Sequence, residues 1–387
     1  MKISEITKVV TGGTPSTKNS SYWDNGTIPW LQSGVCKNTT VKTYSKLITK
    51  EGLNNSSAKM MPPNTVLIAL TGATVGKVAL LPFEACANQS VTGILPNNNF
   101  LPKFLFYQLM SLRSKIIHES YGDAQPHVSQ QYIKDIDIYL PPLAEQERIV
   151  NKLEEQLSQL DSGVESLKKA KKQLELYRQA VLKEAFEKCK KSFALESVCE
   201  HITDGDHMPP PKAPKGIPFI MISNVDKNII DWSKTAFVGE EYFNNIDIKR
   251  KPQKGDVLYT VTGSFGIPIL INFEKDFCFQ RHIALLRPND KVLQKFLYYV
   301  LLHPNVYKQA KEKATGTAQK TVGLGVLRKI IIPFTEDKTT QNSIVDEIDS
   351  KLSICDSIEQ SIEKSLQQSE ALRQSILRES FVPNFSR

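Results

Sequence analysis

The stretch EQERIVNKLEEQLSQLDSGVESLKKAKKQLELYRQAVLKEAFEK, residues 145–188, decides the fold of this chain. It contains no proline, and its apolar residues recur at steps of three and four, which is the spacing of a heptad seam. The seam positions are Val150, Leu153, Leu157, Leu160, Val164, Leu167, Leu174 and Val181. At 1.5 Å per residue, residues 149–188 would form a helix about 60 Å long. Such a helix needs a partner along its apolar side.

The partner is predicted in the same chain, because residues 341–381 repeat the pattern 195 positions later. The segment RQAVLKEAF at 178–186 matches RQSILRESF at 373–381, and Asp161-Ser162 matches Asp356-Ser357. The second seam consists of Val345, Ile348, Leu352, Cys355, Ile362, Leu366 and Ile376. We therefore expect two long helices that pack against each other in antiparallel orientation.

The composition predicts a soluble, cytoplasmic protein of two or three domains. The chain has 387 residues with 40% hydrophobic content, enough for sizeable cores. Its N-terminus has no apolar stretch of signal-peptide length, and runs such as VLIAL at 66–70 are too short to span a bilayer. The six cysteines form no CxxC pair, so neither a zinc site nor a disulfide framework is expected. A net charge of +8 favours a polyanionic partner, although many ordinary proteins are equally basic.

The parts of the chain outside the helices also repeat. IPFIMISNVDKN at 217–228 corresponds to IPWLQSGVCKN at 28–38, VLYTVTGSFGIPIL at 257–270 to VLIALTGATVGKVAL at 66–80, and FQRHIALLRP at 279–288 to NQSVTGILP at 88–96. The chain is thus a tandem duplication. We expect globular domains at 1–143 and 191–335, with long helices at 144–190 and 336–387.

The two copies share apolar positions but differ at positions that a surface would display. This matching predicts that Lys77 is replaced by Pro268, Ser90 by Arg281 and His127 by Thr321. Different polar residues on a common core are consistent with two ligand sites of different specificity. Neutral drift between two surfaces would look similar.

Within the first copy, Val66–Leu70 and Val78–Leu81 read as strands joined by a tight, glycine-dependent turn that displays Lys77. The turn is not a Walker ATP site, because only three residues separate its glycines and Val78 follows the lysine. Residues 100–120 read as one helix, and a further strand is expected to end at Pro141-Pro142.

The candidate binding residues are polar or basic and lie in predicted loops and turns. Hydroxyl and lysine side chains suit phosphate contacts, whereas amide, guanidinium and imidazole groups can contact base edges. The same residues are also compatible with a solvated surface that binds nothing. The candidates are Thr14, Ser16, Lys18, Lys77, Gln125 and His127 in the first copy, and His207, Lys212, Lys215, Arg281, His282 and Gln319 in the second.

Three further motifs complete the pattern: GGTPS at 12–16, TDGDH at 203–207 and PPLAEQERIV at 141–150. With the order domain, helix, domain, helix, they make the chain resemble the specificity subunit of type I restriction-modification enzymes over essentially its whole length. PPLAEQ followed by IV is the most specific signature. The second copy departs from it, since PFTEDKTTQNSIV at 333–345 keeps only Pro333, Gln341 and Ile344-Val345.

The resemblance implies an α+β fold with two target-recognition domains, each reading one half of a bipartite double-stranded DNA target. It implies that the two antiparallel coiled-coil helices set the spacing and dock two methyltransferase subunits, which restriction subunits can join. S-adenosylmethionine, ATP and Mg would serve those partners, and this chain would bind no cofactor or metal. The sequence agrees that the chain is not an enzyme, since it has no adenine-methyltransferase motif, no phosphate loop and no evident metal cluster.

Two other classes of function stay open at this point. The chain could be a protein-interaction scaffold with two binding domains tethered by a coiled coil, or a self-contained DNA enzyme. Weak salt dependence of DNA binding would favour the scaffold. Methyl transfer by the purified chain would establish the enzyme.

Charged residues interrupt both seams, at Lys171 and Arg178 in the first and at Arg373 in the second. A two-stranded coiled coil disfavours charges at such positions. Either the side chains bend outwards to solvent, or the C-terminal turns of each helix leave the pair. In the second case, those turns would contact the next globular domain or a methyltransferase subunit.

Overall fold

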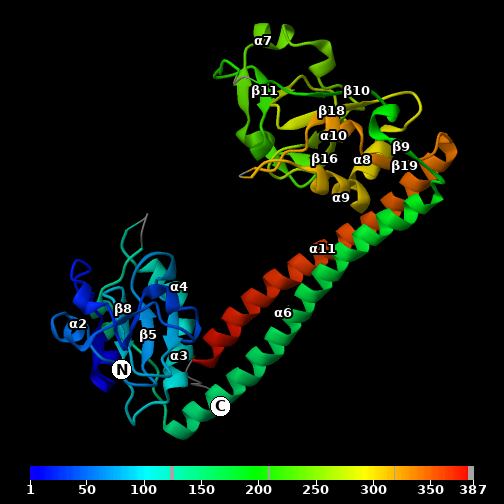
Figure 1. The fold of residues 1–387 in the computed structure, drawn as a ribbon. Helices are drawn as coiled ribbons and strands as arrows, with labels where there is room; N and C mark the ends of the chain where they lie inside the picture. The colour runs from blue at the N-terminus through cyan, green and yellow to red at the C-terminus, as the bar shows by residue number, and fades with distance from the viewer. Residues whose placement is uncertain (123–125, 208–209, 318, 382–387) are drawn as a thin grey trace. The chain divides into compact units, whose positions relative to one another are not determined.

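The structure is a computed structural model that describes residues 1–122, 126–207, 210–317 and 319–381. It contains two compact units, of which the first comprises Met1–Leu167 with Lys364–Arg387 and the second Lys168–Glu363. Both units include stretches of the long helices α6 (Leu143–Ala185) and α11 (Lys338–Ser380), which lie side by side (Figure 1). The predicted α+β fold with two long helices is confirmed.

The first unit is built on a five-stranded sheet with the order β1-β8-β5-β6-β3. Its pairs are antiparallel except for β3 with β6. A separate three-stranded sheet has the order β4-β2-β7, and its strands are interspersed in the sequence with those of the first sheet. The strands are β1 (Val9–Thr11), β2 (Ile28–Leu31), β3 (Thr39–Thr40), β4 (Lys46–Ile48), β5 (Val66–Ala69), β6 (Val78–Leu80), β7 (Cys86–Ala87) and β8 (Val91–Ile94).

Helices complete the core of the first unit. The helix expected at 100–120 is two helices, α3 (Pro102–Ser111) and α4 (Arg113–His118), which meet at Leu112. The others are α1 (Ile3–Ile6), α2 (Lys50–Asn54) and α5 (Gln130–Asp135). Val150, Leu153 and Leu157 of α6 and Leu377 of α11 belong to the same apolar cluster as the sheet and α3. The helix pair is therefore part of this core.

The second unit repeats this construction with a sheet of order β10-β18-β15-β16 and a sheet of order β14-β11-β17. Two two-stranded sheets, β12-β13 and β19-β9, are added. The strands are β9 (Lys191–Ala194), β10 (Cys199–Asp204), β11 (Ile217–Ile220), β12 (Val225–Asp226), β13 (Ile229–Ile230), β14 (Ala236–Val238), β15 (Val257–Thr260), β16 (Pro268–Leu270), β17 (Cys278–Phe279), β18 (Ile283–Pro288) and β19 (Ile331–Phe334). The helices are α7 (Glu240–Asn244), α8 (Gln294–Leu302), α9 (Pro304–Lys313) and α10 (Leu324–Arg328).

The strand expected before Pro141-Pro142 does not form. Its only pairing in the described chain is an isolated bridge between Asp137 and Lys2. The corresponding segment of the second unit is a full strand, β19, because β9 pairs with it over four residues. In the first unit the facing segment instead enters helix α1 at Ile3, so it offers too few extended residues for a ladder.

A buried glutamine ties each long helix to its globular part. Gln146 Nε2 donates to the Pro141 carbonyl at 2.8 Å and the Asn99 carbonyl at 3.3 Å, while its Oε1 accepts from Leu101 N at 2.8 Å. Gln341 makes the same three bonds, to the Thr335 and Lys291 carbonyls and from Leu293 N. Leu101 and Leu293 are the N-caps of α3 and α8. This explains why the glutamine of PPLAEQ persists in the second copy when most of the motif does not.

The predicted seam residues of both long helices are covered, either by the other helix or by the apolar core of a globular part. In α6, Val150, Leu153, Leu157, Leu174 and Val181 are buried, and the other predicted seam residues are half-buried. In α11, Val345, Ile348, Cys355 and Ile362 are buried, and Leu352, Leu366 and Ile376 are half-buried. No predicted seam position is exposed, so the heptad reading of both helices is correct.

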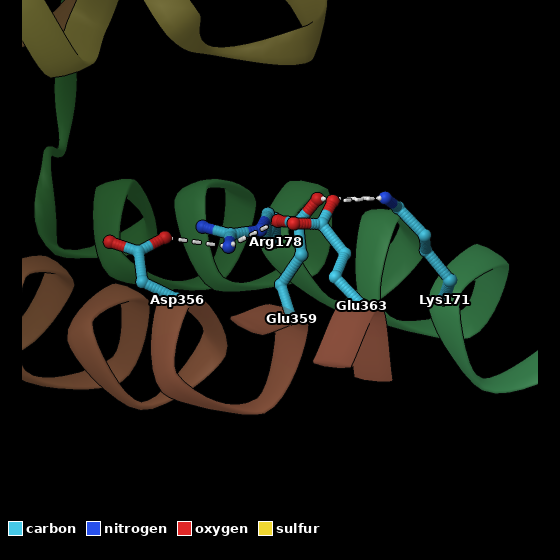
Figure 2. A network of polar contacts seen from close by, with 5 residues as sticks. All are labelled: Lys171, Arg178, Asp356, Glu359 and Glu363. Carbon is cyan, nitrogen blue, oxygen red and sulfur yellow. Dashed lines mark hydrogen bonds and ion pairs between the residues drawn. The ribbon is translucent and has the colours of Figure 1, made fainter. Parts of the chain in front are cut away.

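The charged seam residues form ion pairs between the two helices, and the prediction that their turns leave the pair is wrong. Arg178 Nη2 lies 2.6 Å from Asp356 and 3.0 Å from Glu359. Lys171 Nζ lies 2.7 Å from Glu363 and 3.5 Å from Glu359. Figure 2 shows Glu359 between the two cations. The higher-numbered residue of α6 pairs with the lower-numbered residues of α11, so the two helices are antiparallel.

The duplication repeats this pairing in the first unit, where Arg373 of α11 pairs with Asp161 of α6. Arg178 and Asp356 are 24% and 64% exposed at their side chains, and Arg373 and Asp161 are 23% and 61% exposed. Further along α6, Leu182, Ala185 and Phe186 do join the core of the second globular part. Contact with the next globular part thus begins after the charged positions.

We expect these ion pairs to set the alignment of the helices more than their stability. Since one partner is mostly exposed, a double-mutant cycle of Arg178→Ala with Asp356→Ala should give a coupling energy of about 0.5 kcal/mol that decreases with added salt. The Arg373→Ala and Asp161→Ala cycle is the matched control and should give the same value. A coupling above about 2 kcal/mol in urea unfolding would show that the pairs are major stabilising contacts.

Candidate nucleic-acid interface

The candidate residues of the first unit come from segments that meet at one end of the five-stranded sheet. At this end β1 stops and β8 starts beside it, and the turn between β5 and β6 lies on the other side of β8. Gly12 N donates to the Val91 carbonyl at 3.1 Å, Leu70 N to the Ser90 carbonyl at 2.9 Å, and Gly72 N to the Pro126 carbonyl at 2.9 Å. These bonds hold the loop after β1, the turn before β8, the β5–β6 turn and the segment before α5 together.

Five of the six candidates in this unit are placed by the structure. Thr14, Ser16, Lys18 and His127 are exposed, and Lys77 is half-buried in the β5–β6 turn. Thr14 is held at this sheet end by its hydrogen bond to Gln89, whereas Ser16 and Lys18 follow in the same loop. His127 is bridged to Thr71 at the start of that turn. Gln125 lies outside the described residues. The sheet end therefore gathers hydroxyl, lysine and imidazole groups from distant parts of the sequence.

The glycine of each loop after the first strand is required by close packing. A Cβ on Gly12 would lie 2.1 Å from the Ala87 carbonyl oxygen, and a Cβ on Gly205 would lie 1.9 Å from that of Phe279. Both distances are far below any real contact, so the loop can approach the neighbouring chain only with glycine. This accounts for the glycines in GGTPS and TDGDH.

The second unit gathers its candidates at the equivalent sheet end. Four of them, His207, Lys212, Arg281 and His282, line one open cavity of about 430 Å³. Its walls are largely apolar, with Phe219, Met221, Ala236, Phe237 and Val238 among them. Lys215 and Gln319 are exposed but do not line the cavity. The cavity combines an apolar floor with cationic side chains.

The aspartates of TDGDH organise this site, although they are not among the candidates chosen from the sequence. Asp204 lies 2.9 Å from His207 Nε2 and 3.6 Å from Arg250. Tyr242 donates a hydrogen bond of 2.6 Å to Asp206, whose carboxylate is also 4.0 Å from Arg250. Burial, reinforced by this bond to Asp206, raises the pKa of Tyr242. The network fixes the loop that carries His207.

Backbone hydrogen bonds correct the matching of the two copies. Gly12 N to Val91 O corresponds to Gly205 N to Ile283 O, and Leu70 N to Ser90 O corresponds to Val261 N to His282 O. Ser90 is thus equivalent to His282, and Gln89 to Arg281. Lys77 O accepts from Ala69 N as Ile267 O does from Thr260 N, so Lys77 matches Ile267, not Pro268. The equivalence of His127 and Thr321 is correct, because they bridge Thr71 and Thr262.

The error in matching concealed one residue, Gln89. It is exposed at the same sheet end, and its Oε1 accepts a 2.6 Å hydrogen bond from Thr14 Oγ1. Gln89 lies in the repeated segment NQSVTGILP. Because Arg281 was matched with Ser90, Gln89 was not chosen as a candidate. Aligning VTGI with IALL as strands of equal burial would have revealed it.

All six cysteines are free thiols in the structure. Among the described residues, no group of three or more His, Cys, Asp or Glu side chains is placed to hold a metal ion. Over the same part of the chain, no helix has the length and apolar character needed to cross a membrane.

Comparisons with known proteins agree with this architecture. A family model described as "Type I restriction modification DNA specificity domain" matches residues 1–176 and 188–368. The chain is 30% identical over 185 residues to the type I restriction enzyme EcoR124I/EcoR124II specificity subunit of Escherichia coli, a match that spans 46% of each chain, about half the length of that relative. It is 23% identical over 396 residues to the type I restriction enzyme MjaVIII specificity subunit of Methanocaldococcus jannaschii, covering 94% of this chain and 89% of the relative.

The fold is shared with a solved chain described as "Structural basis underlying complex assembly and conformational transition of the type I R-M system". The TM-score is 0.78 at 21% sequence identity, and the superposition covers 100% of this chain and 97% of that chain. At this identity the likeness concerns the fold alone.

Proposed function

Since this chain belongs to the family of type I restriction-modification specificity subunits, we propose that each of its globular units reads one half of a bipartite double-stranded DNA target. The observation that supports this most is the convergence of polar and basic side chains on the equivalent sheet end of both units. One scaffold that carries different side chains in its two copies suits two different half-sites.

Within this proposal, the recognition domains are residues 1–143 and 191–335, and the helices at 144–190 and 336–387 act as a spacer and as the docking surface for two methyltransferase subunits. Restriction subunits can join them. Lysines and hydroxyl groups fix the register on phosphates, and amide, imidazole and guanidinium groups read base edges. Methyl transfer and cleavage, with their S-adenosylmethionine, ATP and Mg, belong to the partners.

The experiment is selection from a random DNA library with the full chain, alone and with the methyltransferase subunit that it is proposed to bind. The expected result is two short conserved sequences separated by a gap of fixed length. Removing one heptad from each long helix shortens the spacer by about 10 Å, so the gap should shrink by roughly three base pairs at 3.4 Å per pair.

A gap of unchanged length in the shortened variant would contradict the spacer role while leaving DNA recognition intact. Selection of no preferred sequence by the unmodified chain with its partner would contradict DNA recognition itself. Thermal unfolding of the shortened variant checks that both globular units remain folded.

A further inference from the structure

The turn before β8 in the first unit and the turn before β18 in the second are built in the same way. Residues 88–91 and 280–283 each form a four-residue turn, closed by a bond from Val91 N to the Asn88 carbonyl at 3.2 Å and from Ile283 N to the Gln280 carbonyl at 3.1 Å. The first residue of each turn donates its N–H to the neighbouring strand, at Leu31 and Ile220 respectively. The turns are therefore held rigidly at the sheet end.

Each turn displays one side chain. Along 87–91 and 279–283 the burial pattern is the same: the two outer residues are buried, the next two are half-buried, and the central residue is exposed. That central residue is Gln89 in the first unit and Arg281 in the second. A side chain on a short turn fixed at both ends is positioned more accurately than one on a long loop.

The side-chain amide of Gln89 has hydrogen-bonding groups available that match those of adenine. Thr14 donates to Gln89 Oε1 at 2.6 Å, which orients the amide and leaves a second lone pair on that oxygen. The Nε2 group has no hydrogen bond with the described part of the chain. A glutamine amide with one acceptor and one donor available is complementary to N6 and N7 of adenine in the major groove.

The surroundings of Arg281 leave its guanidinium available. It has no ion pair with the described residues. Asp206, whose carbonyl accepts a hydrogen bond from Arg281 N, has its carboxylate engaged by Tyr242 and Arg250. His207, the equivalent of Thr14, is paired with Asp204 instead. A free guanidinium donates two parallel hydrogen bonds, which matches O6 and N7 of guanine.

We propose that Gln89 and Arg281 are equivalent base-reading residues, with Gln89 reading an adenine in one half-site and Arg281 a guanine in the other. The inference rests on the proposed function and makes it specific. Thr14 is a positioning residue for the Gln89 amide. Lys212, which is exposed and lines the same cavity as Arg281, contacts phosphate in this proposal.

The test exchanges the two side chains. The full chains carrying Gln89→Arg or Arg281→Gln, with the methyltransferase subunit bound, are selected against the random library. In Gln89→Arg, one position of the first half-site should change from adenine to guanine, with a preference of about 5- to 150-fold, the range for a bidentate base contact. In Arg281→Gln, one position of the second half-site should change from guanine to adenine. The other half-site should stay the same in each case.

Two further variants separate base reading from other effects. Lys212→Gln should weaken binding to all sequences alike and reduce the salt dependence of binding by about one phosphate contact, without changing base preference. Thr14→Val should reduce the adenine preference at the Gln89 position while leaving the salt dependence unchanged. Both residues are exposed, so thermal unfolding should match that of the unmodified chain.

The outcomes distinguish this inference from the function on which it rests. If both exchange variants select the original bipartite target unchanged, or if either variant changes both half-sites, the assignment of Gln89 and Arg281 is wrong although DNA recognition stands. If the unmodified chain selects no bipartite target, the proposed function fails first.

Discussion

Replacing Gln146 with leucine should lower the free energy of unfolding of the first unit by about 3–5 kcal/mol. The side chain is fully buried and makes three hydrogen bonds. Leucine has a similar volume but no polar atoms, so one N–H and two carbonyl groups would lose their partner. Each buried group left without a partner costs about 1–3 kcal/mol, partly offset by the better burial of leucine.

Hydrogen exchange on the full chain measures this effect and its location. In Gln146→Leu the amide of Leu101 should lose protection, while the amide of Leu293 should keep it. Gln341→Leu is the matched variant and should show the reverse. Gln159→Leu, on an exposed position of α6, should affect neither amide. Retained protection of Leu101 in Gln146→Leu would mean that water replaces the amide without penalty.

Replacing Asp256 with alanine should destabilise the second unit by about 3–5 kcal/mol, because it leaves the charge of Arg287 without its partner. The pair is bidentate, with Nε and Nη2 of Arg287 each 2.8 Å from the carboxylate. The two side chains are only 14% and 3% exposed. The hydrogen bond to Asp256 raises the pKa of Arg287, so the arginine stays charged at any ordinary pH.

Urea unfolding of three variants tests this prediction. Asp256→Ala should show the full loss, whereas Asp256→Ala combined with Arg287→Met should recover most of it, since no charge then remains buried. Glu274→Ala removes the partner of Lys254 in an ion pair whose side chains are 84% and 57% exposed, and it should change stability by less than about 0.5 kcal/mol. Equal effects of Asp256→Ala and Glu274→Ala would contradict the argument.

The sequence predicted the parts of the fold that depend on periodicity and repetition. The heptad spacing predicted both long helices, although α6 and α11 end at Ala185 and Ser380, earlier than the predicted 190 and 387. The duplication implied that one globular fold occurs twice. Pairing between specific charges was not predictable in this way. Arg178 and Arg373 interrupt an apolar pattern, and only the register of the two helices shows that Asp356 and Asp161 face them.

The candidate binding residues stay predictions, and the sequence could place them in loops and turns but not in relation to one another. Loops rich in small and polar residues were predicted to lie at the surface, because such segments cannot enter a core. The sequence did not predict which of these loops lie next to one another. The choice between adjacent residues depends on the strand register, which backbone hydrogen bonds determine. A shift of one position separated Gln89 from Arg281. The roles of Asp204 and Asp206 could not be predicted for a different reason, because their partners Arg250 and Tyr242 lie far along the chain.

The first compact unit combines residues from both ends of the chain, and this affects the order in which the two units can fold during synthesis. The ribosome makes residues 1–167 first, yet the core of this unit includes Leu377 of α11. The second unit is continuous from Lys168 to Glu363, so all of its residues emerge earlier than that leucine. The segment synthesised first is therefore completed last, and until then the apolar side of α6 near Val150 and Leu157 lacks part of its cover. Contacts across more than two hundred residues also slow folding, because the intervening chain must be ordered or closed into a loop. In a growing chain of this kind, residues 1–167 would depend most on chaperones during the time between their own synthesis and that of α11.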